Sequence, residues 1–68
     1  MKNLADAIYC VNAITTTRYR GYSIQLEHYE DRMWVELRGE RINEACIDLD
    51  HAKRVARAHR AGEPLPVA

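Results

Sequence analysis

The apolar residues of the chain follow two different periods, and the helical one is the clearest. After Asp48, four apolar residues are spaced as one face of a helix: Leu49, Ala52, Val55 and Ala56. The opposite side of the same helix is basic: Lys53, Arg54, Arg57 and Arg60. Asp48 or Asp50 can cap the helix start, and Gly62 is a typical helix stop. The pattern therefore predicts a C-terminal helix over 48–62, followed by an extended, proline-containing tail over 63–68.

The central part of the chain alternates between apolar and polar residues, as half-buried strands do. Three runs show this pattern: 19–29, 33–38 and 40–47. The polar residues 30–32 predict a hairpin loop, and Gly39 predicts the second turn. Because Met33 and Val35 belong to the apolar side, the alternation places Trp34 on the opposite face. The runs together predict an antiparallel meander.

The residues before the meander allow two interpretations. The apolar residues between Lys2 and Ile14 are spaced as one helical face, which favours a short amphipathic helix. The segment Ile8–Thr17 instead contains β-branched residues and tyrosine, which favour an extended strand. The three threonines at 15–17 are poor helix formers, so they would end a helix in this region.

Together these patterns predict a single small α+β domain. It is a three-stranded antiparallel sheet, with an N-terminal helix and a C-terminal helix packed on one face. Its expected segments are an N-terminal helix or arm over 1–16, the meander over 17–47, the C-terminal helix over 48–62 and the tail over 63–68. The other face of the sheet, which carries Trp34, then stays open.

Length and charge narrow the classes of partner. A chain of 68 residues buries only about 60% of its unfolded surface, so a homodimer is a plausible extra source of stability. Ten basic and ten acidic side chains give a net charge of zero, which disfavours a dedicated nucleic-acid binder. The middle of the chain is acidic and residues 53–60 are basic. Such a dipolar surface suits a charged protein partner or a second copy of the chain.

The cysteines and the apolar runs indicate the cellular compartment in which the protein is expected. Cys10 and Cys46 are too few for a secreted disulfide scaffold. Asp6 and Asn12 interrupt the apolar residues near the N-terminus, so no signal peptide is recognisable there. No apolar run has membrane-spanning length. We therefore expect reduced thiols, a cytoplasmic protein and no membrane partner.

The residues that usually carry catalysis or bind metals do not form a recognisable motif. His28, His51 and His59 lack the spacing of metal ligands, and there is no Cys-x-x-Cys pair. No serine or cysteine has an evident base beside it, and the three glycines are too isolated to form a phosphate-binding loop. The sequence thus predicts no metal site, no cofactor and no catalytic residues, and the protein is not expected to be an enzyme.

Two features remain as candidate binding sites. The basic helix side formed by Lys53, Arg54, Arg57 and Arg60 is either a solvated face or a contact surface for phosphates or an acidic protein. Trp34 either lies over neighbouring strand residues or anchors an interface, where tryptophan is enriched. In the second case Tyr19 and Tyr29 would widen an exposed aromatic patch.

The segments that frame the meander resemble those of short phage- and prophage-encoded proteins. The residues concerned are Tyr19-Arg20-Gly21-Tyr22-Ser23-Ile24, then Trp34, then Asp48-Leu49-Asp50-His51-Ala52-Lys53. The resemblance implies a stoichiometric binder, a class that includes anti-CRISPR proteins and other host-takeover inhibitors. We therefore expect a non-enzymatic protein-binding module, such as a phage or mobile-element inhibitor of a larger host complex. The alternatives are a small nucleic-acid-binding protein that uses the basic helix, and a structural homodimeric subunit.

Overall fold

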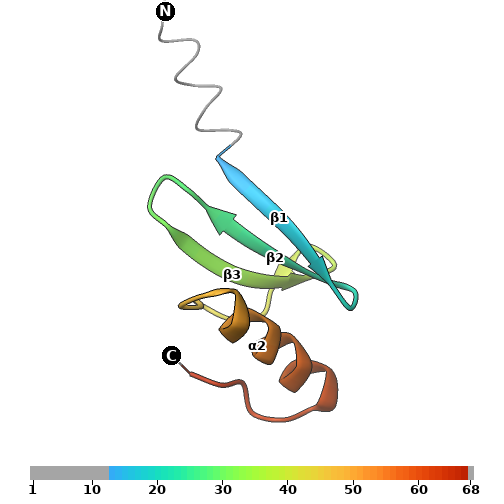
Figure 1. Cartoon of the computed structure of the whole chain (residues 1–68). Helices are drawn as coiled ribbons and strands as arrows, with labels where there is room; N and C mark the ends of the chain where they lie inside the picture. Colours follow the sequence, from blue (N-terminus) through green and yellow to red (C-terminus); the bar gives the residue numbers. More distant parts are fainter. Residues whose placement is uncertain (1–12, 68) are drawn as a thin grey trace, which may run out of the picture.

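The structure, a computed structural model, describes residues 13–67 and has an α+β fold (Figure 1). Its elements are β1 (Ile14–Tyr19), β2 (Tyr22–Glu27), β3 (Arg32–Leu37), β4 (Glu40–Arg41) and α2 (Leu49–Ala61). The strands form one antiparallel sheet in the order β1-β2-β3-β4, and α2 packs over β2 and β3. The prediction of an α+β domain with an antiparallel meander and a C-terminal helix is confirmed. The sheet has four strands within residues 13–67, so the predicted three is wrong.

The additional strand comes from a hairpin that the alternation pattern conceals. The sequence predicts one strand over 19–29, but Arg20 and Gly21 form a two-residue turn with φ values of 51° and 89°. Positive φ at both positions gives a type I′ turn, whose twist matches that of the flanking strands. β1 therefore begins at Ile14, earlier than the expected meander start at 17. The N-terminal helix predicted over 1–16 otherwise lies outside the described residues.

The segment predicted as the third strand, 40–47, is mostly irregular. Only Glu40 and Arg41 form β4, which follows a second turn of the same type. Beyond it, the side chain of Asn43 accepts a hydrogen bond of 2.9 Å from the backbone N–H of Val35. Cys46 then returns to β3, where its N–H donates to the carbonyl of Met33 at 2.8 Å. A side chain thus replaces part of the backbone ladder, and the chain bends toward α2.

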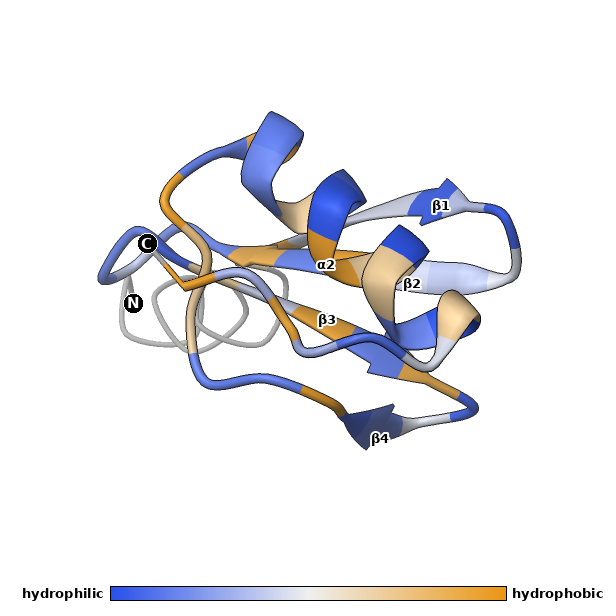
Figure 2. Ribbon diagram, turned by 90° about the horizontal axis from the view of Figure 1, so that it is seen from below, coloured by the Kyte–Doolittle hydropathy of each residue, from blue (hydrophilic) through white to orange (hydrophobic). Residues whose placement is uncertain are grey.

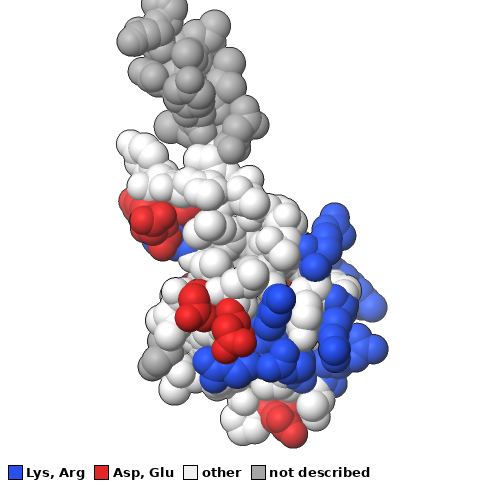
Figure 3. All heavy atoms as spheres, viewed as in Figure 1, with Lys and Arg blue, Asp and Glu red and all other residues white. Residues whose placement is uncertain are grey.

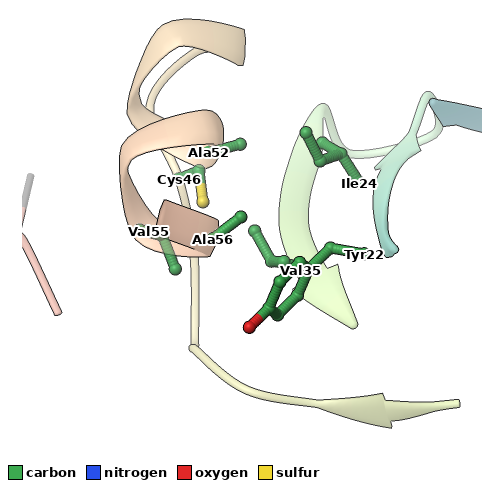
Figure 4. Close-up of a cluster of buried hydrophobic side chains, with 7 residues drawn as sticks. All are labelled: Tyr22, Ile24, Val35, Cys46, Ala52, Val55 and Ala56. Atoms are coloured by element: carbon green, nitrogen blue, oxygen red, sulfur yellow. The ribbon is translucent and has the colours of Figure 1, made fainter. Parts of the chain in front are cut away.

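The core lies between α2 and one face of the sheet. Its buried residues are Tyr22, Ile24, Val35, Cys46, Ala52, Val55 and Ala56. Figure 4 shows the side chains of the helix and of the strands pointing toward one another. Figure 2 shows α2 over the sheet, with hydrophobic segments in both α2 and β3. The two alanines are almost completely buried, so the helix backbone lies close to the sheet. A narrow apolar stripe is therefore enough to cover this face.

The start of α2 is joined to the C-terminal tail by a buried histidine. Asp48 caps the helix by accepting from the His51 backbone N–H at 2.8 Å. The His51 ring is only 1% exposed, and its Nδ1 accepts from the Ile47 N–H at 3.1 Å. Since Nδ1 is an acceptor, the ring proton is on Nε2, which lies 3.0 Å from the carbonyl oxygen of Pro66. His51 therefore holds the loop before α2 and the tail after it.

Replacing His51 with leucine should lower the stability of the domain. The side chains have similar bulk, but leucine leaves the Ile47 N–H and the Pro66 carbonyl without partners. Each lost hydrogen bond to a buried group costs about 1–3 kcal/mol. We expect the free energy of unfolding, measured by urea denaturation, to fall by about 2 kcal/mol or more.

The matched control is His59→Leu. His59 is an exposed residue whose ring packs edge-on against the Tyr22 ring, with 5.6 Å between the ring centres. Its Nδ1 lies 2.8 Å from the Tyr22 hydroxyl, and water can replace this hydrogen bond. The control should cost less than about 1 kcal/mol. Equal losses in the two variants would contradict the joining role of His51.

Candidate functional site

Basic side chains gather where the β1–β2 hairpin meets α2. We define the basic surface as Tyr19, Arg20, Lys53, Arg57 and Arg60, which the contacts below connect. Figure 3 shows the lysine and arginine side chains concentrated on one side of the molecule, over α2 and the hairpin end of the sheet. Some of the acidic side chains visible in this view border that concentration, and others lie at the far end of the sheet. The basic side chains are therefore clustered, with carboxylates at their margin.

Two arginines of the helix fix the hairpin in position. The Arg57 Nη1 donates to the Tyr19 hydroxyl at 2.9 Å, and the Arg60 Nη1 donates to the Arg20 carbonyl at 3.4 Å. The cationic groups of Arg20 and Lys53 each lie 5.4 Å from the centre of the Tyr19 ring, within cation–π range. Tyr19 is thus surrounded by three cations. These contacts hold the cationic groups in place before any partner binds.

The cations also change the acidity of Tyr19. The hydrogen bond from Arg57 lowers the pKa of the phenol below its ordinary value, and the positive charges of Arg20, Arg57 and Lys53 act in the same direction. Partial desolvation opposes them. The net lowering reports a positive local potential, because such a potential stabilises the phenolate. An anionic group of a partner would be stabilised at the same place.

The structure divides the predicted basic site. Lys53, Arg57 and Arg60 come together around Tyr19, as described above. Arg54 instead points to Asp50 one turn earlier, and its Nε lies 3.2 Å from the carboxylate. Arg54 and Arg57 also line a shallow groove between α2 and the tail, whose other lining residues are Ala58, Ala61, Glu63, Pro64 and Pro66. Arg54 therefore lies at the margin of the basic surface, with its charge already paired.

Trp34 lies on the face of the sheet opposite α2, as the alternation predicts, but it is not exposed. Only 7% of its surface is accessible, so the expected exposed aromatic patch is wrong. The Arg41 guanidinium stacks 4.2 Å above the ring centre, and the indole Nε1 donates to Glu36 at 2.7 Å. Gln25, directly opposite on β2, also donates to Glu36. The contacts with Arg41 and Glu36 hold the Trp34 ring against the sheet of its own chain. The role of Trp34 in binding a partner stays a prediction.

The histidines and the described cysteine lie apart from one another. His28 contacts the Thr15 hydroxyl, while His51 and His59 have the separate partners given above. Cys46 is a free, buried thiol, and its burial raises its pKa. Among residues 13–67, no group of three or more histidine, cysteine, aspartate or glutamate side chains is placed to hold a metal ion. Cys10 lies outside the described residues.

Sequence reasoning missed the strand side of the basic surface. Tyr19 and Arg20 are far from α2 in the sequence, and helical spacing cannot reveal them. A signal was present, however, because Arg20-Gly21 between two tyrosines fits a two-residue hairpin with glycine in its second position. The helix side was identified from the sequence because its spacing is local.

Comparisons of the chain with protein-family models, curated proteins and solved structures find no match. Over residues 13–67, no helix is sufficiently long and apolar to cross a membrane. The site must therefore be interpreted from its own geometry and charge.

Trp34→Ala should destabilise the domain. The ring is buried between polar side chains, and removing it exposes strand backbone and leaves Glu36 with only the longer hydrogen bond from Gln25. We expect a loss of about 2–4 kcal/mol in chemical denaturation. Trp34→Phe is the matched control, because it keeps a ring beneath Arg41 and removes only the indole donor; it should cost about 1 kcal/mol. An unchanged denaturation midpoint for Trp34→Ala would mean that the ring is not packed as described.

The phenol of Tyr19 should ionise at lower pH than an ordinary tyrosine, because its pKa is lowered. An NMR titration of the Tyr19 ring signals measures this. Arg57→Gln should move the Tyr19 titration upward, toward its ordinary value of 10.0, because the principal stabilising hydrogen bond of the phenolate is lost. Arg32→Gln removes the same charge as Arg57→Gln, but Arg32 lies at the end of β3 that is remote from Tyr19. This variant should leave the pKa of Tyr19 unchanged. A Tyr19 titration insensitive to Arg57→Gln would refute this contact.

Proposed function

We propose that the protein is a non-enzymatic protein-binding module that docks through its basic surface on an acidic patch of a larger protein. The observation that carries the proposal is the hydrogen bond from Arg57 to Tyr19, which fixes an arginine against an aromatic ring at the centre of the basic surface. Arginine and tyrosine are, together with tryptophan, the residues enriched at binding hot spots. A side chain that is already fixed loses less entropy on binding, which favours affinity.

The distribution of charge favours an acidic protein over a nucleic acid. The basic surface is bounded by carboxylates, with Asp50 beside Arg54 and Glu63 along the groove that Arg57 lines. A long phosphate backbone would extend past the basic surface and meet these groups. A compact acidic patch would not. The net charge of zero supports the same choice, because nucleic-acid binding usually depends on a positive excess.

The resemblance to short phage-encoded proteins supplies a more specific form of the proposal. Proteins of that kind act stoichiometrically on a larger host complex, including as anti-CRISPR inhibitors. A rigid, basic contact surface on a small domain is compatible with such a role, because steric occupation of an acidic site requires no catalytic group. Nucleic-acid binding is the alternative that the following experiment separates.

The proposal is tested by affinity capture from a lysate of the source organism, with and without nuclease treatment, with wild type, Arg57→Gln and Arg32→Gln as baits. Wild type should retain an acidic protein in stoichiometric amount. Once that partner is purified, its affinity for Arg57→Gln should be weaker than its affinity for wild type by about tenfold or more. Arg57 is exposed, so its replacement should change stability by only about 0.5 kcal/mol. Thermal melts of each bait verify that folding is preserved.

Arg32→Gln controls for charge alone. Arg32 is exposed beside Glu30, at the end of β3 remote from the β1–β2 turn, so its loss should leave binding unchanged. Equal capture by all three baits would rule out the basic surface as the docking site. Capture that disappears on nuclease treatment, with a steep dependence on salt, would establish nucleic-acid binding in place of the proposed function.

A further inference from the structure

The outer edge of β1 is the long open edge of the sheet. β1 stands at one end of the strand order, and among the described residues no strand lies beyond it (Figure 1). At the other end, β4 and the bridge from Met33 to Cys46 occupy the free side of β3. Every residue from Ile14 to Arg18 is exposed. The backbone of a six-residue strand is thus available on one side.

The pairing of β1 with β2 determines which backbone groups face outward. The His28 N–H donates to the Ala13 carbonyl at 2.7 Å, so these two residues form a hydrogen-bonded pair. Such pairs alternate along an antiparallel ladder, and Thr15, Thr17 and Tyr19 therefore bond to β2. The intervening residues direct their N–H and C=O groups away from the sheet: Ile14, Thr16 and Arg18.

This edge has few of the features that usually prevent pairing. Its one charged side chain is Arg18, and it has no proline, no lysine and no bulge in its register with β2. The helix lies over β2 and β3, so it does not cover the edge. Three consecutive threonines give the strand high β-propensity without an apolar surface. Such an edge accepts another strand through its backbone.

We propose that β1 pairs with β1 of a second copy of this chain, antiparallel, with Thr16 directly opposite the partner's Thr16. This register pairs the whole strand, and it makes about six backbone hydrogen bonds between the outward groups. It also places each Arg18 opposite Ile14 of the partner subunit. Registers shifted toward the turn would bring the two Arg18 side chains together, and like charges in direct opposition are destabilising.

The arrangement extends one sheet through both copies. A twofold axis through a hydrogen-bonded pair stands perpendicular to the sheet, so both α2 helices lie on the same face. Tyr19 of one copy then lies opposite Ala13 of the other, and the two basic surfaces are about 20 Å apart along the paired strands. The pairing does not depend on the function proposed above, because it uses the outward backbone groups of Ile14, Thr16 and Arg18, none of which belongs to the basic surface.

The test is a charge exchange at the symmetry axis. Wild type, Thr16→Val, Thr16→Lys and Thr16→Glu are each examined by sedimentation equilibrium from micromolar to millimolar concentration. Wild type and Thr16→Val should show a monomer–dimer equilibrium. Thr16→Lys alone and Thr16→Glu alone each place two like charges opposite one another, so each should dimerise about tenfold more weakly. Mixing these two variants should restore dimerisation, and native mass spectrometry should show the mixed dimer in excess.

Thr16 is exposed, so circular dichroism should show the same monomer fold for all four proteins. A wild type that stays monomeric at millimolar concentration would overturn the proposal. The proposal would also be overturned if the mixture of Thr16→Lys and Thr16→Glu dimerised no more strongly than either variant alone. In that case the symmetry axis would not pass through Thr16.

Discussion

The pairing of Ile24 on β2 with Val35 on β3 is the contact on which the rest of the structure depends. Both side chains are almost fully buried beneath α2, and they are direct partners in the ladder. A slip of β3 by one residue would turn Trp34 toward the helix in place of Val35 and disrupt the apolar face. The register also sets the polar face, where Gln25, Trp34 and Glu36 meet. One pairing thus organises both sides of the sheet.

The parts of the fold that depend on residues close together in the sequence could be predicted from the sequence. The helix boundaries followed from Asp48, Gly62 and a local apolar spacing, and the faces of β3 followed from alternation. β1 could not be found in the same way, because both of its faces are exposed and no alternation marks it. Its turn depends on an arginine at positive φ, a conformation that few non-glycine residues adopt.

The candidate site shows the same division between local and distant information. Helical spacing was sufficient to group Lys53, Arg57 and Arg60, but their relation to Tyr19 required the hairpin to fold back against the helix. The burial of Trp34 likewise depends on Arg41, which reaches the ring from another strand. Alternation assigns a residue to a face, but it does not specify which long polar side chains will cover it. Exposure is therefore harder to predict than orientation.

The hydrogen bond between His51 and Pro66 has a consequence for the status of the tail. Residues 63–67 contain no helix or strand, yet the Pro66 carbonyl accepts the proton of a buried imidazole, and Leu65 packs against the core. A chain cut after Gly62 would leave that proton without its carbonyl and would remove one wall of the groove beside α2. The tail is therefore part of the folded domain, and its removal would lower the stability of the sheet and helix that remain.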